Sequence, residues 1–184
     1  TYYTLTTFNN LIKKHNLKII DFNFNEINGG SVEIICAKKN YKSNMKNNEL
    51  KEYLDDEKNI TKISYQKFNQ RVENTKKNIL EILKIIGNNK NVIGYGASTK
   101  GNIVLNHCNI TSKDIKYICD ANPFKLKKFT PGSNIQIISK EKMRKLNPKY
   151  LLVLIWSFRS EVINQEIEFI KKGGKLIFHL PQLH

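Results

Sequence analysis

The second half of the chain alternates short apolar runs with amphipathic segments, and this alternation constrains the fold more than any other feature of the sequence. The apolar runs are not interrupted by polar residues, which indicates strands that are buried on both faces. Strands that alternate with helices form parallel sheets, so residues 61–184 are predicted to form a three-layer α/β domain with a mainly parallel sheet. We expect strands at residues 92–94, 115–119, 150–156 and 176–179, a brief apolar segment at 135–138, and helices at residues 100–107, 140–146 and 160–170.

The beginning of the chain has a different pattern. Residues 5–12 show apolar side chains at helical spacing, and two apolar runs at residues 17–24 and 31–37 flank a pair of glycines. This order predicts a helix followed by an antiparallel pair of strands, which is too small to be a domain by itself. We therefore interpret residues 1–38 as the C-terminal remnant of an upstream domain and the chain, which begins with Thr1, as a fragment of a longer protein.

Between these two parts we predict a linker and a long helix. Residues 39–60 are dominated by Lys, Asn, Asp and Glu, with space for a short helix around Leu50. Residues 61–86 carry apolar side chains at spacings of three, four and seven, which indicates one face of a long helix. The predicted organisation is a domain remnant at 1–38, a linker at 39–60 and the α/β domain at 61–184.

The composition excludes several classes of protein. With 184 residues, of which 40% are hydrophobic and 26% charged, the chain is neither disordered nor collagen-like. Its cysteines, Cys36, Cys108 and Cys119, are far apart and form no C-x-x-C pair, which argues against a disulfide framework or a zinc site. No apolar run is long enough to cross a bilayer, and no signal peptide is recognisable. We therefore expect a cytoplasmic protein without membrane contact.

The formal net charge of +15 arises from 31 Lys and Arg residues against 16 Asp and Glu residues. Such an excess would suit binding to nucleic acid, where cationic side chains neutralise phosphates. However, the lysines occur together with many Asn and Ile residues, a combination encoded by A- and T-rich codons, and they form no basic block. This distribution favours a compositional habit of the chain and argues against a nucleic-acid partner, while a mildly basic cleft for an anionic metabolite is the alternative between them.

The sharpest local motif, GYGASTKGN at residues 94–102, follows the first predicted strand of the α/β domain and opens a helix. Its glycines allow a tight turn and close approach of a ligand, while the N–H groups at the start of a helix attract an anion. The dinucleotide fingerprint would require glycine in place of Thr99, and a P-loop would require Lys-Ser or Lys-Thr in place of Asn102-Ile103. The predicted fold is therefore Rossmann-like without matching either motif, and a glycine turn needed only for packing remains an alternative.

Two further residues are expected at the same edge of the sheet. Asp120 ends the second strand, where a carboxylate contacts ribose hydroxyls in dinucleotide-binding folds, although an Asx turn before Pro123 explains it equally well. Trp156 ends the third predicted strand, at residues 150–156, which has the strongest strand pattern in the chain. An indole at that position either closes the core or stacks on a base. The histidines have no metal-ligand spacing, and no Ser or Cys lies in a nucleophile elbow. From the residues alone, the chain has an anion-binding loop, no catalytic set and no metal site.

A longer set of motifs follows in order along the chain: IGYGASTKGN at 93–102, Leu105-Asn106, Asp120-Ala121-Asn122-Pro123, Lys127, Thr130-Pro131-Gly132, Ile155-Trp156-Ser157-Phe158, GGKLI at 173–177 and Leu180-Pro181. This ordered set resembles the C-terminal domain of SAM-dependent sugar C-methyltransferases. Residues 2–31 also resemble the last helix and hairpin of the methyltransferase domain in that family. The resemblance therefore covers nearly the whole chain.

The resemblance implies a parent enzyme with a zinc-binding module, a central SAM-binding domain and this C-terminal domain. Members of the family transfer a methyl group from SAM to a carbon of a nucleotide-linked keto-sugar. Their catalytic Tyr/Glu/His cluster, SAM loop and zinc cysteines lie upstream of the part that matches this chain. We therefore expect no catalytic residue, metal or cofactor in the chain and no activity of the chain alone. Its expected partners are the nucleotide-linked sugar and the upstream methyltransferase domain.

The motif and the resemblance together predict one set of substrate-binding residues, which are Gly94, Tyr95, Gly96, Ala97, Ser98, Lys100, Gly101, Asn102, Asp120, Asn122 and Trp156. Many relatives carry Arg at the position of Ala121 and Asn at the position of Ser157, so contacts made by those groups would be lost here. Two alternatives remain, namely an NAD(P)-binding oxidoreductase domain and a non-catalytic domain for packing or dimerisation. The sequence specifies neither the sugar, the nucleotide and the modified carbon nor the oligomeric state.

Overall fold

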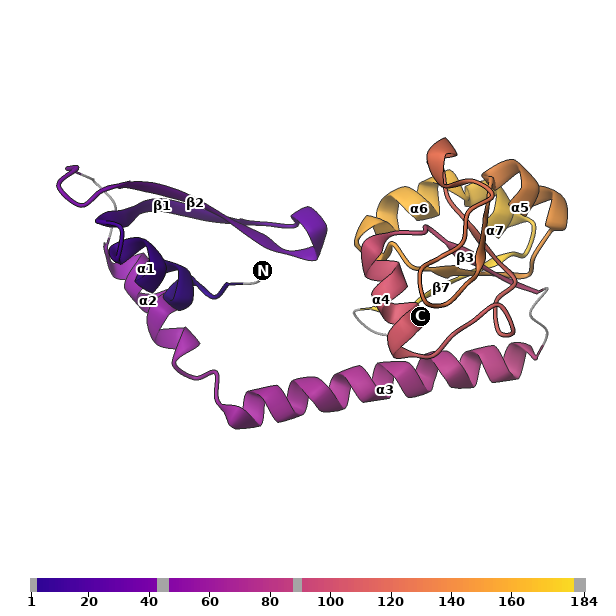
Figure 1. The fold of residues 1–184 in the computed structure, drawn as a ribbon, viewed down its shortest axis with the longest axis horizontal. Coiled ribbons are helices and arrows are strands. Elements are labelled where there is room, and N and C mark those ends of the chain that lie inside the picture. The colour runs from indigo at the N-terminus through magenta and orange to yellow at the C-terminus, as the bar shows by residue number, and fades with distance from the viewer. Residues whose placement is uncertain (1–2, 43–46, 88–90, 181–184) are drawn as a thin grey trace. The chain divides into compact units, whose positions relative to one another are not determined.

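The structure of the chain is a computed structural model that describes residues 3–42, 47–87 and 91–180 (Figure 1). It divides into two compact units, Thr1–Asn69 and Gln70–His184. We call the first the hairpin unit and the second the sheet unit.

The hairpin unit begins with the predicted helix and strand pair. Helix α1 (Leu5–Lys13) is capped by Thr4, whose hydroxyl oxygen accepts a hydrogen bond from the Thr7 N–H at 3.1 Å. Strands β1 (Leu17–Asn25) and β2 (Ser31–Lys38) pair in antiparallel fashion around the short 3-10 helix η1 (Ile27–Gly29). The predicted antiparallel pair is thus confirmed.

The segment predicted as a linker contains helix α2 (Asn47–Glu57), which packs against α1. The carboxylate of Glu57 accepts hydrogen bonds from the Leu5 and Thr6 N–H groups, both at 2.7 Å, at the start of α1. Apolar side chains of α2 also pack against the small core, which consists of Leu5, Ile12 and Ile19. This part of the chain is therefore integrated into the hairpin unit, while the assignment of residues 1–38 to an upstream domain stays a prediction.

The long predicted helix is α3 (Lys62–Ile86). Only its last turns are buried, where Ile79 is 1% exposed and Ile82, Leu83 and Ile86 pack against the core of the sheet unit. Earlier in α3, Ile63, Tyr65 and Phe68 are exposed.

The sheet unit contains one five-stranded sheet with the strand order β5-β4-β3-β6-β7, and every pair of neighbours is parallel. The strands are β3 (Val92–Tyr95), β4 (Tyr117–Cys119), β5 (Gln136–Ile138), β6 (Tyr150–Val153) and β7 (Lys175–Phe178). The helices are α4 (Thr99–His107), α5 (Lys140–Leu146), α6 (Arg159–Gln165) and α7 (Ile167–Lys171), with a 3-10 turn η2 (Pro123–Lys125) after β4.

Successive residues of each strand point to opposite faces, and each face has its own core. On one face, residues such as Ile118 and Leu152 pack against α3 and α4. On the other face, residues such as Ile93 and Leu151 pack against side chains of α5, α6 and α7. This arrangement confirms the predicted three-layer α/β fold and positions the carboxyl ends of all five strands at one edge.

Two predicted elements differ in detail. Strand β6 ends at Val153, and Trp156 begins a 3-10 turn, η3 (Trp156–Phe158). The helix predicted at residues 160–170 is broken between α6 and α7 at Glu166, whose side chain is only 1% exposed. Its carboxylate accepts a hydrogen bond from the Tyr95 hydroxyl at 2.9 Å, so this helix turns a polar residue toward the sheet.

Within the described ranges, no helix is both long and apolar enough to cross a membrane.

Candidate ligand-binding site

The predicted loop lies where the order of the strands reverses. Strands β4 and β5 lie on one side of β3, and β6 and β7 lie on the other side. In open α/β sheets, ligands bind outside the carboxyl ends of the strands at this switch point. The loop between β3 and α4 starts at this point, so the fold places the glycine motif where such domains bind ligands.

The glycines of the motif are required for packing within the chain. A Cβ atom on Gly94 would lie 2.6 Å from Cγ1 of Ile118, and one on Gly101 would lie 2.8 Å from Cβ of Leu154. Gly96 has a φ of +90°, and its Cβ atom would lie 2.5 Å from Cγ2 of Ile155. Packing alone accounts for all three glycines, as the alternative interpretation proposed. Evidence for a ligand must therefore come from other groups.

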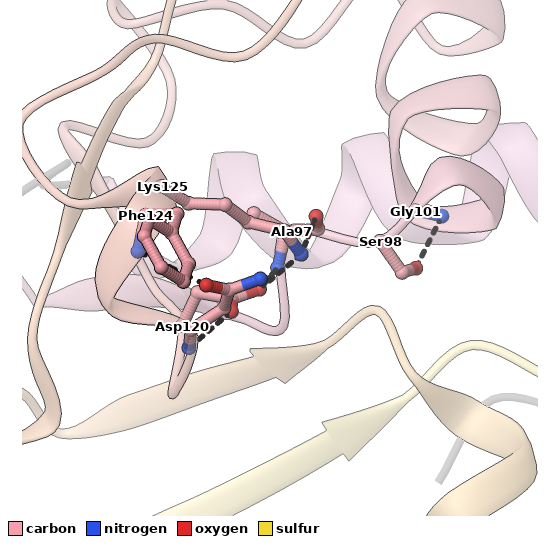
Figure 2. A network of polar contacts seen from close by, with 7 residues as sticks. Ala97, Ser98, Gly101, Asp120, Phe124 and Lys125 are labelled. Atoms are coloured by element: carbon pink, nitrogen blue, oxygen red, sulfur yellow. Dashed lines mark hydrogen bonds and ion pairs between the residues drawn. The ribbon is translucent and has the colours of Figure 1, made fainter.

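The Asp120 side chain is hydrogen-bonded to the loop between β3 and α4 (Figure 2). Its Oδ2 atom accepts hydrogen bonds from the Ala97 N–H at 2.8 Å and from the Lys125 ammonium at 3.1 Å. Its Oδ1 atom accepts from the Asn122 N–H at 2.8 Å, which is the predicted Asx turn. Asn122 in turn accepts from the Phe124 N–H at 3.0 Å through its own side-chain oxygen. Both side chains thus shape the turn after β4, and a contact of either with a ligand stays a prediction.

The start of α4 has the features of an anion-binding helix terminus. Ser98 is its N-cap, and the Ser98 hydroxyl accepts a hydrogen bond from the Gly101 N–H at 2.9 Å. The first turn carries no acidic residue, so the positive end of the helix dipole is not neutralised there. The Ser98 hydroxyl acts as a cap in this structure, and the helix terminus itself is the group that would attract an anion.

Lys100 and Trp156 come together from the two sides of the switch point. The Lys100 ammonium lies 5.6 Å from the centre of the Trp156 indole, a cation–π contact. Trp156 is half-buried just beyond the end of β6, whereas Lys100 belongs to the first turn of α4. The side-chain oxygen of Asn102, also in α4, is buried and has no hydrogen-bond partner among the described residues. The predicted set therefore converges on one charged group, one aromatic ring and the start of α4.

Tyr95 and Ala97 were also predicted to bind substrate. The Tyr95 side chain is 2% exposed and lies in the core on the α6 side, where burial and the neighbouring Glu166 carboxylate raise the pKa of its hydroxyl far above the usual value. Ala97 is also buried. The Tyr95 carbonyl oxygen accepts from the Leu154 N–H, and both peptide groups of Ala97 bond to side chains of the turn after β4, so a contact of either residue with a ligand stays a prediction.

The sequence did not single out two residues of the turn after β4. The Lys125 ammonium bonds the Ala97 carbonyl oxygen at 2.9 Å in addition to Asp120. Phe124, the residue before it, is 81% exposed beside this network. An apolar residue in a polar turn was the only local signal for Phe124, and nothing local marked Lys125.

Other residues of the motifs have structural roles. The Asn106 side-chain amide on α4 donates to the Asn102 carbonyl at 2.7 Å and to the Pro131 carbonyl at 3.0 Å. Gly132 has a φ of +75° and lies against that amide, where a Cβ atom would lie 2.0 Å from the Asn106 oxygen. These contacts tie the Thr130-Pro131-Gly132 turn to α4.

The described residues do not fit a resident zinc ion. They contain no group of three or more His, Cys, Asp and Glu side chains placed to hold a metal. Cys108 and Cys119 are buried free thiols, and burial raises the pKa of Cys119 to about 12, which opposes the thiolate form that zinc requires.

The sheet and its edge define a doubly wound parallel α/β domain of the kind that binds ligands at a switch point. Residues 26–181 match the family described as the C-methyltransferase C-terminal domain. The chain is also 30% identical, over 186 aligned residues, to the C-methyltransferase NovU of Streptomyces niveus. That alignment covers 99% of this chain and 44% of the relative, so the chain spans less than half of the length of that protein. The chain belongs to the C-methyltransferase C-terminal domain family, which confirms the resemblance seen in the sequence.

Proposed function

We propose that this chain is the substrate-holding part of a SAM-dependent C-methyltransferase and that its ligand is a nucleotide-linked keto-sugar. The observation that supports this proposal best is the convergence of the α4 N-terminus, Lys100 and Trp156 at the switch point of a family member. The diphosphate of such a ligand is anionic and suits the helix terminus and the lysine. The indole offers a flat apolar surface to a base or a sugar ring.

The proposed reaction places the chemistry outside this chain. A base removes the proton from the carbon beside the keto group, and the resulting enolate carbon attacks the methyl group of SAM. The carbon–sulfur bond of SAM breaks, and the sulfonium becomes a neutral thioether. In the family that the sequence resembles, the residues for these steps lie upstream, so the chain contributes binding and orientation of the sugar nucleotide.

A thermal-shift panel tests the ligand class. It contains dTDP-, UDP-, GDP- and CDP-linked sugars, the free nucleotides, SAM, NAD and NADP. A ligand at a hundred times its Kd stabilises the folded chain by about 2.7 kcal/mol, so weak ligands are detectable. A shift with one nucleotide-sugar series and none with SAM supports the proposal. A shift with NAD alone contradicts it and favours the oxidoreductase alternative.

Matched lysine variants test the site. Lys100→Met keeps most of the apolar stem but removes the charge, and we expect it to weaken nucleotide-sugar binding about tenfold or more. Lys145→Met removes an exposed lysine from the last turn of α5 and should leave binding unchanged. Equal effects of both variants would mean that only net charge matters, which would contradict a site at Lys100.

An activity assay tests the location of catalysis. The chain mixed with SAM and a nucleotide-linked keto-sugar should give no methylated product. Methyl transfer by the chain alone would show that catalysis does not require upstream residues. If no nucleotide binds and light scattering shows a defined dimer, the packing alternative is favoured instead.

A further inference from the structure

A side-chain pair from the turn after β4 holds both backbone groups of Ala97, and we call this arrangement the Ala97 clamp (Figure 2). Asp120 accepts the Ala97 N–H at 2.8 Å, and the Lys125 ammonium donates to the Ala97 carbonyl oxygen at 2.9 Å. The two side chains also bond each other at 3.1 Å. The clamp therefore consists of Asp120, Lys125 and the peptide groups of Ala97.

The clamp acts on the residue that precedes the N-cap of α4. Ala97 lies directly before Ser98, so fixing both of its peptide groups fixes the direction in which the chain enters the helix. The Asp120 side chain is 11% exposed and that of Lys125 39%, so the charged bonds are only partly accessible to water. Hydrogen bonds that involve ionised groups are stronger than neutral ones, which suits a pair that holds a loop in place.

The clamp also separates the roles of two lysines at this edge. The Lys125 ammonium has three protons to donate, and two of its bonds are directed at Ala97 and Asp120. Lys100 lies instead over the Trp156 indole on the other side of the loop. A lysine that is held by the loop orients that loop, and a direct phosphate contact by Lys125 would have to use its third proton.

We propose that Lys125, acting with Asp120, is a positioning residue that aims the start of α4 at the anionic group of the ligand. This proposal assigns Asp120 to the loop instead of to the ribose hydroxyls predicted from the sequence. It rests on the proposed function for the identity of the ligand, although the clamp itself does not depend on a ligand.

Hydrogen exchange of the Ala97 amide tests the clamp without any ligand. Asp120→Asn replaces the carboxylate that accepts the Ala97 N–H by a weaker amide acceptor, and Lys125→Met removes the ammonium that holds this carboxylate and the Ala97 carbonyl, so each should raise the exchange rate of the amide at least tenfold. Lys125→Arg, which retains donors for both partners, should restore most of the protection. Lys128→Met, which changes an exposed lysine nearby, is the matched control and should change nothing. Unchanged exchange in both clamp variants would overturn the proposal. The amides of β3 and β6 report whether each variant remains folded.

A double-mutant cycle then tests how Lys125 affects binding, with dTDP and inorganic pyrophosphate as the probes. We expect Lys125→Met to weaken binding about tenfold in the natural sequence and to add almost nothing when Asp120 is already Asn. An equal loss in both backgrounds, with a reduced salt dependence, would show that Lys125 contacts phosphate directly and would overturn the proposal. If neither probe nor any nucleotide-sugar binds while the Ala97 amide responds as expected, the clamp itself is supported, but the proposed function fails and the positioning role fails with it.

Discussion

The two units use similar strand-forming residues but cover their sheets differently. In the sheet unit, every residue of β3 is buried, because helices pack on both faces. In the hairpin unit, one face of the β1–β2 pair packs on α1 and α2, while Ile35, which alternates to the opposite face, is 49% exposed. Burial of apolar surface is the main stabilising contribution, so stability should follow the number of covered faces. The hairpin unit is expected to be much the weaker of the two.

The largest expected effect is in native-state hydrogen exchange. Amides of β3 and β6 should exchange only through global opening of the sheet unit, with free energies in the range of about 5–15 kcal/mol. Amides of β1 and β2 should exchange through opening of the hairpin unit, at least about 2 kcal/mol lower, because two-stranded sheets are marginal. Equal protection of the β1–β2 amides and the β3–β6 amides from exchange would contradict the expected difference in stability between the two units.

A matched pair of leucine substitutions is expected to have the next largest effect. Leu151 on β6 is fully buried, and Leu5 on α1 is 4% exposed. Leu151→Ala should lower the free energy of unfolding of the sheet unit by about 2–5 kcal/mol, because a rigid core leaves a cavity. Leu5→Ala should cost its own unit about 2 kcal/mol, since a small core relaxes more easily. Urea titration followed by hydrogen exchange at each unit measures both changes. A loss of protection in β3 caused by Leu5→Ala would contradict independent units.

Two glycine substitutions give a smaller and more specific contrast. In Gly94→Ala the new methyl group meets the buried Ile118 side chain, which should cost the sheet unit about 1–3 kcal/mol. In Gly30→Ala the methyl group meets nothing within 4 Å, but the φ of +116° disfavours any L side chain. That change should cost the hairpin unit about 1–2 kcal/mol through the backbone alone.

The control for this contrast is the partner of the steric clash. Adding Ile118→Ala to Gly94→Ala removes the atom that the methyl group meets, so the double variant should be more stable than the sum of the single effects predicts. Gly30 has no such partner within 4 Å among the residues that the structure describes. Strictly additive effects at Gly94 and Ile118 would mean that the clash is relieved in another way. Thermal unfolding of the natural sequence, of Gly94→Ala, of Ile118→Ala and of the double variant measures the coupling.

Much of the fold followed from the sequence because its signals are local. Buried strands appear as apolar runs, and the segments between them show helical spacing or turn residues. The break at Glu166 did not follow, because Ile163, Ile167 and Ile170 continue the helical spacing past it. What turns Glu166 inward is a hydrogen bond to Tyr95, 71 positions away in the chain. A contact of that kind leaves no local pattern.

The site was predictable to the same extent. The loop before α4 was located correctly, because glycine turns are visible in the sequence, whereas Trp156 lies in a 3-10 turn beyond β6 and not at the end of the strand. Strand alternation would also have placed the Tyr95 side chain beside Ile93, on the face away from Gly94. Lys125 was missed because its bond to Ala97 spans 28 positions, and one lysine among many carries no signal of its own.

The smallest expected effect is a difference in the response of the two units to acid. His179 in the sheet unit is 1% exposed, its Nδ1 atom donates to the Val153 carbonyl oxygen at 3.2 Å, and its buried Nε2 atom has no partner among the described residues. Burial lowers the pKa of His179 below 6.5, despite the opposing effect of that hydrogen bond. In the hairpin unit, burial of Glu57 opposes ionisation, but hydrogen bonds from Thr6 and Leu5 outweigh it and lower its pKa below 4.5.

In both cases the unfolded chain binds the proton at a higher pH than the folded chain, so stability falls as the pH falls. The windows differ, because the contribution of His179 is lost as the pH drops below about 6.5, whereas that of Glu57 is complete until about 4.5 and is lost only below it. Urea unfolding of each unit between pH 7.5 and 5 should therefore show a decline in the sheet unit that His179→Gln reduces. In that range the stabilising contribution of Glu57 to the hairpin unit should not vary with pH, so Glu57→Gln should lower the stability by the same amount at pH 7.5 and at pH 5. A Glu57→Gln effect that disappears at pH 5 would contradict the low pKa of this carboxyl and with it the role of Glu57 in holding α2 against α1.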